Sequence, residues 1–248
     1  MTVEQPVTIL AVESSAGPAS CAVVRYENGK ETVLCSACVN NRLTHSQTLM
    51  PMIQDMLKNA ALTLSDISAL AVAVGPGSFT GVRIGVAAVK GLAFANNLPC
   101  APISTLAGMA SRFAGIPYTG LILTAMDARC QQIYTALFSC ENGVVTRITP
   151  DEALPIAEVA ARLQGETRPL MIVGDGTEVC LDAVRAVVPT AVAAPTGLRY
   201  QHAIGVAREA VFTVDSDAWV SGEELLPSYL RLPQAERELR AKQEQTSK

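Results

Sequence analysis

The chain contains one strand–turn–helix pattern twice. An apolar strand, a glycine-containing turn and a helix beginning near a hydroxyl residue read VGPGS at 74–78 and VGDGT at 173–177. In each half, an earlier strand ends at a carboxylate, Glu13 in the first and Asp127 in the second. Two coincidences in matching places predict a pair of duplicated lobes. A ligand of such a protein is expected in the cleft between the lobes.

Hydrophobic periodicity predicts the same order of elements in both halves. In the first half we expect strands at 7–12, 20–26, 31–39, 70–74 and 99–103, and helices at 46–61, 80–96 and 105–113. In the second half we expect strands at 121–126, 132–139, 144–148, 170–173 and 191–193, and helices at 156–163, 178–187 and 200–212. The predicted domains are therefore residues 1–115 and 116–222. In the C-terminal segment, 223–248, we expect the first part to pack on the body and the polar end to be disordered.

The composition narrows the classes of function. Hydrophobic residues make up 49% of the chain and charged residues 17%, which is typical of a globular protein. Aromatic residues make up only 4%, which argues against a platform on which nucleic-acid bases stack. The net charge of −4 argues against a chain that holds RNA unaided. We therefore expect any contact with RNA to depend on a partner.

The chain is expected to work in the cytoplasm. Residues 1–6 have neither a basic flank nor an apolar core, so we expect no signal peptide. No apolar run approaches the ~20 residues that span a bilayer, so we expect no membrane contact. The seven cysteines are scattered and odd in number, which is typical of a reducing compartment. Cys35 and Cys38 form a C-x-x-C sequence on an expected strand, where we favour buried free thiols over a redox pair.

The glycine turn at 75–81 allows two interpretations. Successive backbone N–H groups at such a turn, next to a helix N-terminus capped by Ser78 or Thr80, can hold an anion. However, any connection from a strand to a helix also needs a tight turn, so short glycine motifs alone are weak evidence. The candidate residues of a phosphate or nucleotide cleft are Glu13, Ser14, Ser15, Gly75, Gly77, Ser78 and Asp127.

The residues around this turn closely resemble the TsaB family of bacterial subunits for tRNA threonylcarbamoyladenosine synthesis. The matching residues are GPGSFTGVRIG at 75–85, KGLA at 90–93, ESS at 13–15, HSQ at 45–47, DAR at 127–129 and PSYLR at 227–231. The resemblance covers residues 7–231. It implies an α/β, two-lobed actin-like ATPase or sugar-kinase fold, built from two RNase H-like lobes with mixed sheets. Glu13 departs from the family pattern, in which aspartate is more common.

The resemblance implies a subunit without catalytic residues and without a metal. The related transferase TsaD holds a metal through an H-x-x-x-H pair, whereas Thr105 and Met109 stand at those places here. Neither side chain replaces imidazole for a borderline metal. The two histidines of the chain are far apart in sequence. We expect His45 to cap or hydrogen-bond near a helix start, and His202 to be a surface or half-buried residue of a helix. No intrinsic cofactor is expected, and ADP or ATP is expected to bind only weakly or at a partner interface.

The family also implies a heterodimer with a TsaD-type transferase and recruitment of a TsaE-type ATPase. Purified alone, the chain is expected to form a homodimer, and tRNA is expected to meet the complex rather than this subunit. The helices 46–61 and 80–96 are the predicted interface, because glycines on one face of the second would let another helix approach closely. Without the resemblance, both helices read as ordinary covers of a sheet. The predicted interface residues are His45, Leu49, Met52, Met56, Gly81, Arg83, Gly85, Ala88 and Leu92.

Two alternatives remain open from the residues. The first is an enzyme of the same fold, either a nucleotide-using phosphotransferase or a metal-independent peptidase. Phosphotransfer needs carboxylates, for which Glu13 and Asp127 are candidates, although capping serves them equally well. For a peptidase, Ser78 lacks a recognisable His/Asp partner. The second alternative is a nucleotide-binding regulator that performs no chemistry.

Overall fold

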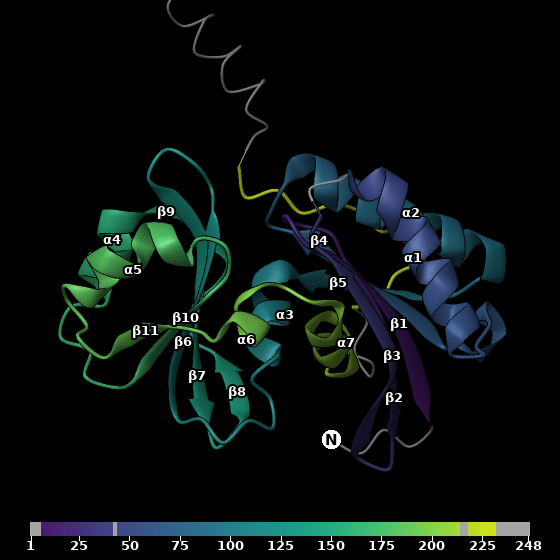
Figure 1. The fold of residues 1–248 in the computed structure, drawn as a ribbon, viewed down its shortest axis with the longest axis horizontal. Helices are drawn as coiled ribbons and strands as arrows, with labels where there is room; N and C mark the ends of the chain where they lie inside the picture. Colours follow the sequence, from purple (N-terminus) through teal and green to yellow (C-terminus); the bar gives the residue numbers. More distant parts are fainter. Residues whose placement is uncertain (1–5, 42–43, 214–217, 232–248) are drawn as a thin grey trace, which may run out of the picture.

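The computed structural model describes residues 6–41, 44–213 and 218–231. In this part of the chain, two mixed sheets form two lobes (Figure 1). The first sheet has the order β3-β2-β1-β4-β5, and its strands are β1 (Val7–Glu13), β2 (Ala19–Glu27), β3 (Lys30–Val39), β4 (Ala69–Gly75) and β5 (Cys100–Ser104). Strand β1 pairs with β2 antiparallel and with β4 parallel.

The second sheet repeats this arrangement. Its order is β11-β10-β6-β7-β8, and β9 also pairs with β7. The strands are β6 (Gly120–Asp127), β7 (Gln132–Glu141), β8 (Val144–Arg147), β9 (Glu152–Pro155), β10 (Leu170–Val173) and β11 (Ala191–Ala193). As in the first sheet, the hairpin is antiparallel, and the next strand joins the central one in parallel. The repeat expected from the sequence is therefore confirmed.

Helices cover both faces of the first sheet. Helices α1 (His45–Asn59) and α2 (Phe79–Asn96) cover its outer face, and α7 (Ala203–Val211) covers its inner face. Along β1, Leu10 and Val12 pack in the outer core, whereas Ile9 and Ala11 pack in the inner core with α7. Because both faces are covered, the strand reads as an unbroken apolar run rather than an alternating one.

The remaining helices join the lobes or cover the second sheet. Helix α3 (Thr105–Ser111) packs with the second sheet and against α7, so both helices lie between the sheets (Figure 1). Helices α4 (Ile156–Arg162) and α5 (Thr177–Arg185) cover the outer face of the second sheet. A short 3-10 turn (Leu64–Asp66) and helix α6 (Thr196–Arg199) complete the described elements. Helix α7 thus follows the second sheet in sequence but packs on the first. The domain limits at 115 and 222 stay a prediction.

The last predicted helix is confirmed, but its start was placed three residues too early. The prediction was 200–212, whereas α7 begins at Ala203 and α6 has already ended at Arg199. The backbone is extended at Tyr200 and at His202, and the His202 ring caps α7 by accepting a hydrogen bond from the N–H of Ile204. A side chain that caps the helix at this point favours a start at Ala203 over one at Tyr200. Strand β9 and helix α6, with four residues each, were not predicted, because such short segments carry too little periodicity.

The C-terminal segment packs on the first lobe, as its first part was expected to do. Leu225 is fully buried in the outer core beneath α2, and just before the segment Val220 pairs with Cys100 in an antiparallel bridge. The end expected to be disordered, 232–248, lies outside the described residues. Within the described ranges, no helix combines the length and the hydropathy needed to cross a bilayer.

Candidate functional site

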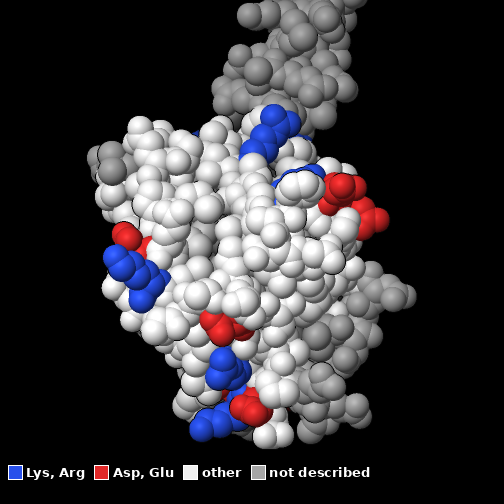
Figure 2. All heavy atoms as spheres, turned by 90° about the vertical axis from the view of Figure 1, so that its right-hand side faces the viewer, with Lys and Arg blue, Asp and Glu red and all other residues white. Residues whose placement is uncertain are grey.

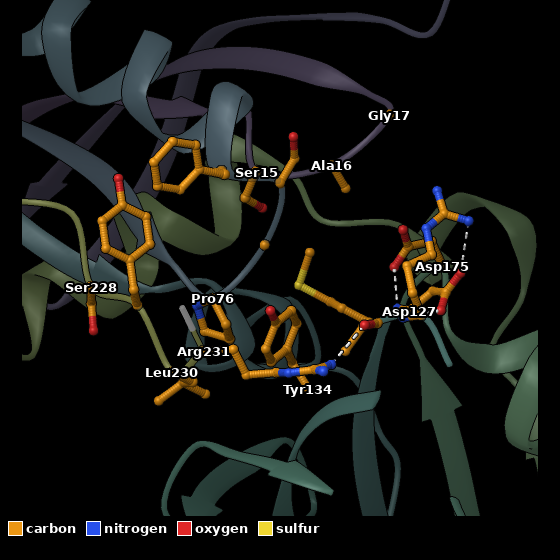
Figure 3. A pocket seen from close by; sticks show the side chains of 17 residues that line it. Ser15, Ala16, Gly17, Pro76, Asp127, Tyr134, Asp175, Ser228, Leu230 and Arg231 are labelled. Atoms are coloured by element: carbon orange, nitrogen blue, oxygen red, sulfur yellow. Dashed lines mark hydrogen bonds and ion pairs between the residues drawn. The ribbon is translucent and has the colours of Figure 1, made fainter. Parts of the chain in front are cut away.

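A cleft of about 470 Å³ opens between the lobes (Figure 3). Its walls come from the turns that follow β1 and β4, from the β6–β7 turn and from residues 228–231. The lining residues are Ser15, Ala16, Gly17, Pro76, Gly77, Ser78, Phe79, Met126, Asp127, Ala128, Arg129, Tyr134, Asp175, Ser228, Tyr229, Leu230 and Arg231. Ser15, Gly77, Ser78 and Asp127 were predicted there. Glu13, Ser14 and Gly75 were also predicted, but they lie buried beneath the surface of the cleft.

The acidic wall of the cleft belongs to the second lobe. Asp127 and Asp175 lie next to each other (Figure 3), and the backbone N–H of Asp127 donates to Oδ1 of Asp175 at 3.4 Å. Desolvation and the charge of Asp127 raise the pKa of Asp175. Asp127 itself pairs with Arg129 at 3.3 Å and accepts the Arg129 backbone N–H at 2.8 Å. The carboxylates are therefore partly neutralised by the chain itself.

Glu13, the counterpart of Asp127, is buried. Its Oε1 accepts the backbone N–H of Ser15 at 2.6 Å, and its Oε2 finds no partner within the described chain. Burial raises the pKa of Glu13 to about 7, against the opposing effect of its hydrogen bonds to Ser15 and Ser14. The carboxyl group does not line the cleft. It therefore cannot face a ligand there without a rearrangement of the turn.

The glycine turn after β4 packs directly on the turn after β1. The backbone N–H of Ser78 donates to the carbonyl of Ser15 at 2.6 Å. A Cβ on Gly77 would lie 2.4 Å from that same carbonyl oxygen, and a Cβ on Gly81 would lie 2.2 Å from the carbonyl oxygen of Ser14. These glycines thus permit a close approach within the chain. The cradle predicted for a phosphate is filled by residues 14 and 15, so the residues present do not fit a phosphate held between these turns.

The predicted interface residues fall into two groups. Leu49, Met52 and Met56 are buried in the outer core, and Gly81 and Gly85 face Ser14 inside the chain. The prediction that these five residues form a surface for a partner is wrong, because the helix faces that carry them pack against the first lobe itself. The others reach the surface: Arg83 is exposed, and His45, Ala88 and Leu92 are half-buried. Whether these four contact a partner stays a prediction.

The surface of α2 presents a different set of residues. We call them the α2 stripe: Thr80, Arg83, Ala87, Gly91 and Phe94, all on the side opposite the buried residues of the helix. Phe79, which precedes the stripe, is half-buried, whereas Phe94 is 84% exposed. Figure 2 turns the side of α1 and α2 toward the viewer and shows few charged side chains there. The spacing of Ala87, Gly91 and Phe94 was readable in the sequence, but the exposed side of the helix was not.

The two histidines and the two cysteines of the C-x-x-C sequence are explained by their own local surroundings rather than by a shared site. His45 Nε2 lies 2.7 Å from the carbonyl of Ala16, which confirms a hydrogen bond near the start of α1. Burial and the charge of Arg112 lower the pKa of His202 to about 4. Cys38 is exposed and Cys35 half-buried, so the expectation of two buried thiols is wrong for Cys38. Among the described residues, no cluster of three or more His, Cys, Asp or Glu could hold a metal ion.

The chain is similar in sequence to known proteins of tRNA threonylcarbamoyladenosine biosynthesis. Residues 40–236 match the family model "TsaD: tRNA N6-adenosine threonylcarbamoyltransferase". A Bacillus subtilis protein named tRNA threonylcarbamoyladenosine biosynthesis protein TsaB is 31% identical over 229 residues, or 92% of this chain and 96% of that protein. The Escherichia coli protein of the same name is 34% identical over 70% of this chain and 74% of its own length.

Solved structures agree with these sequences. YeaZ from Pseudomonas aeruginosa superposes with a TM-score of 0.74 at 30% identity, over 90% of this chain and all of that one. Component A of the Acidaminococcus fermentans (R)-2-hydroxyglutaryl-CoA dehydratase superposes with a TM-score of 0.50 at 12% identity, over 84% of this chain and 98% of that one. The latter likeness concerns the fold alone. Together with the two mixed sheets, these findings confirm the fold expected from the sequence.

Proposed function

The chain belongs to the TsaB family, and from this premise we propose that it is a non-catalytic partner subunit for tRNA threonylcarbamoyladenosine modification, which occurs at the adenosine next to the anticodon. It binds a TsaD-type transferase as a heterodimer and activates it together with a TsaE-type ATPase. The tRNA meets the complex rather than this subunit, since the chain carries a net charge of −4. The complex works in the cytoplasm, in keeping with seven cysteines that are all free.

The α2 stripe is the observation that carries this proposal. A glycine inside a helix costs about 1 kcal/mol relative to alanine. At Gly91 no packing within the described chain offsets this cost, because a Cβ there would meet no atom within 4 Å beyond its neighbours and its own helical backbone. Small residues at Ala87 and Gly91 let a second helix approach closely, and the exposed ring of Phe94 offers it apolar area. A partner helix packed on the α2 stripe accounts for the small residues Ala87 and Gly91 and for the exposed Phe94.

The interior of the lobes supports the absence of independent catalysis. Ser78 serves as the N-cap of α2, where its hydroxyl accepts the N–H of Gly81 at 3.3 Å, and the glycine turn is closed against residues 14 and 15. Thr105 and Met109, at the places of the TsaD histidines, are fully buried in the core. Ser78, the candidate nucleophile of a peptidase, thus has a structural role, and Glu13, one of the two carboxylates that a phosphotransferase would use, is buried beneath the cleft. We therefore propose no intrinsic cofactor, and ADP or ATP only with weak affinity or at the partner interface.

The same stripe would pair two copies of the chain when the partner is absent. A two-fold axis brings the same surface of both copies together, and small residues along one helix let two copies of that helix approach closely. The homodimer of the isolated protein is therefore a competitor of the heterodimer, and adding the transferase should convert one into the other.

Co-purification with a TsaD-type transferase, followed by a threonylcarbamoyl transfer assay, tests the proposal. Gly91→Arg places a bulky charge on the α2 stripe and should abolish both pairing and stimulation. Gly197→Arg is the matched control, because Gly197 is also exposed and a Cβ there would also meet no atom within 4 Å. Gly85→Arg is unsuitable, since a Cβ at Gly85 would lie 2.4 Å from Ser14 Oγ. Pairing that survives Gly91→Arg, or turnover by the isolated chain, would overturn the proposal.

A further inference from the structure

The C-terminal segment is anchored along α2. Lys90, on α2, donates from Nζ to the carbonyl oxygens of Glu223 at 3.0 Å and Leu225 at 3.2 Å. The Leu225 side chain is fully buried beneath the same helix. Two backbone hydrogen bonds of 2.8 Å join Val220 to Cys100 at the edge of the first sheet. The segment is therefore part of the first lobe up to residue 225.

The segment next crosses the start of α2. The N–H of Ser228 donates to the carbonyl of Val74 at 2.7 Å, at the end of β4. The ring of Tyr229 then packs on Phe79, with 5.0 Å between the ring centroids. Arg83 donates from Nε to the Tyr229 hydroxyl at 2.8 Å, and its guanidinium lies 3.8 Å from the centroid of the Phe79 ring. One member of the α2 stripe thus holds the segment in place.

The far end of the segment reaches the other lobe. Arg231 donates from its guanidinium to the carbonyl of Ala128 at 2.8 Å, in the β6–β7 turn (Figure 3). The three residues that follow, Arg129, Cys130 and Gln131, have positive φ angles of 64°, 54° and 58°. A side chain at such angles costs free energy, so the turn depends on contacts that hold it. Arg231 supplies one of those contacts from outside the lobe.

We propose that residues 225–231 form an interlobe clasp, which links occupancy of the α2 stripe to the conformation of the β6–β7 turn. A partner on the stripe restrains Arg83, Arg83 restrains Tyr229, and Arg231 then holds the carbonyl of Ala128. Residues 228–231 of the clasp also line the cleft between the lobes. The nature of the partner rests on the proposed function, but the mechanical link exists in the isolated chain.

Hydrogen–deuterium exchange of the isolated protein tests the link without a partner. Arg231→Ala should raise exchange of the amides in 127–132 about tenfold, since a hydrogen bond from a charged donor is lost. Arg83→Ala and Tyr229→Phe should raise it about threefold, although neither residue lies in that turn. Lys58→Ala, an exposed change on α1, is the control and should leave the turn unchanged. If Arg231→Ala has no effect, or if it acts while Arg83→Ala and Tyr229→Phe do not, the clasp is refuted.

A second arm adds the purified TsaD-type transferase. In the wild type, binding should slow exchange in 127–132 at least threefold, while the Arg231→Ala protein should still bind but show no such protection. Binding that leaves the wild-type turn unchanged, or protects both proteins equally, contradicts the clasp and leaves the proposed function standing. Failure of the wild type to bind contradicts the proposed function instead, and the exchange rates of the isolated variants then decide on the clasp alone.

Discussion

Glu13 and Asp127 make the same local hydrogen bond in opposite lobes. Each carboxylate belongs to the last residue of the first strand in its lobe and accepts the backbone N–H two residues later, at 2.6 Å from Ser15 and at 2.8 Å from Arg129. Their surroundings differ, because Glu13 is 1% exposed whereas the Asp127 side chain is 27% exposed. The duplicated lobes have thus kept the turn geometry, while one copy of the carboxylate is sealed inside the protein.

The buried carboxyl group should make stability depend on pH. Burial raises the pKa of Glu13 from 4.5 to about 7 in the folded state, so its contribution to stability is fully present below pH 4.5 and is lost as the pH rises through 7. We expect the unfolding free energy of the wild type, relative to Glu13→Gln, to fall by roughly 2–3 kcal/mol between pH 5 and pH 8. Urea denaturation of both proteins measures this difference, and an unchanged difference would show that Glu13 titrates normally.

Two glycines of α2 should respond oppositely to alanine. Gly81→Ala forces a Cβ to 2.2 Å from the Ser14 carbonyl oxygen and should cost about 2–4 kcal/mol of unfolding free energy. Gly91→Ala, in open space on the same helix, should stabilise the protein by up to about 1 kcal/mol. Thermal unfolding of the two variants compares them. Equal effects of the two changes would mean that a Cβ at position 81 is accommodated without a clash, which contradicts the close contact with Ser14.

His202 should stay neutral far below the usual range of histidine. Its pKa is lowered from 6.5 to about 4 by burial and by the charge of Arg112. The stability that neutral His202 gives is present above pH 6.5 and is lost as the pH falls through 4. An NMR titration of the imidazole C–H signals should place the His202 midpoint near 4. His202→Asn, which can still cap α7, should remove this part of the acid sensitivity.

The exposed ring of Phe94 should drive self-association of the isolated chain. Phe94→Asp puts a charge on the α2 stripe and should weaken the homodimer by about tenfold or more, because burying an unpaired carboxylate is costly. Phe212→Asp is the control, since Phe212 is 58% exposed just after α7 and away from the stripe. Sedimentation equilibrium measures both dissociation constants. A homodimer weakened equally by the two changes would place the contact elsewhere.

Local sequence was sufficient for most elements. The limits of β10 and β11 were predicted to the residue, and those of α1 and α2 to within two. Such predictions succeed because periodicity and turn residues act over a few positions. The start of α7 was placed three residues early, because it depends on the His202 side chain that caps the helix. In the cleft, Asp175 was visible in the second copy of the turn, VGDGT, but nothing local linked it to Asp127.

The sequence by itself determined the two-lobed repeat, the family and the identity of the glycine turn. Only the tertiary structure decided what these residues touch. The helical period placed Gly81, Gly85 and Ala88 together, yet it could not say that the first two meet Ser14, in the turn after β1 and far away in sequence. Likewise, residues 228–231 line the cleft only because β4 and the β6–β7 turn are brought to either side of them. The physical reason is that a local pattern fixes which side chains share a face, whereas packing between distant segments fixes which face is covered.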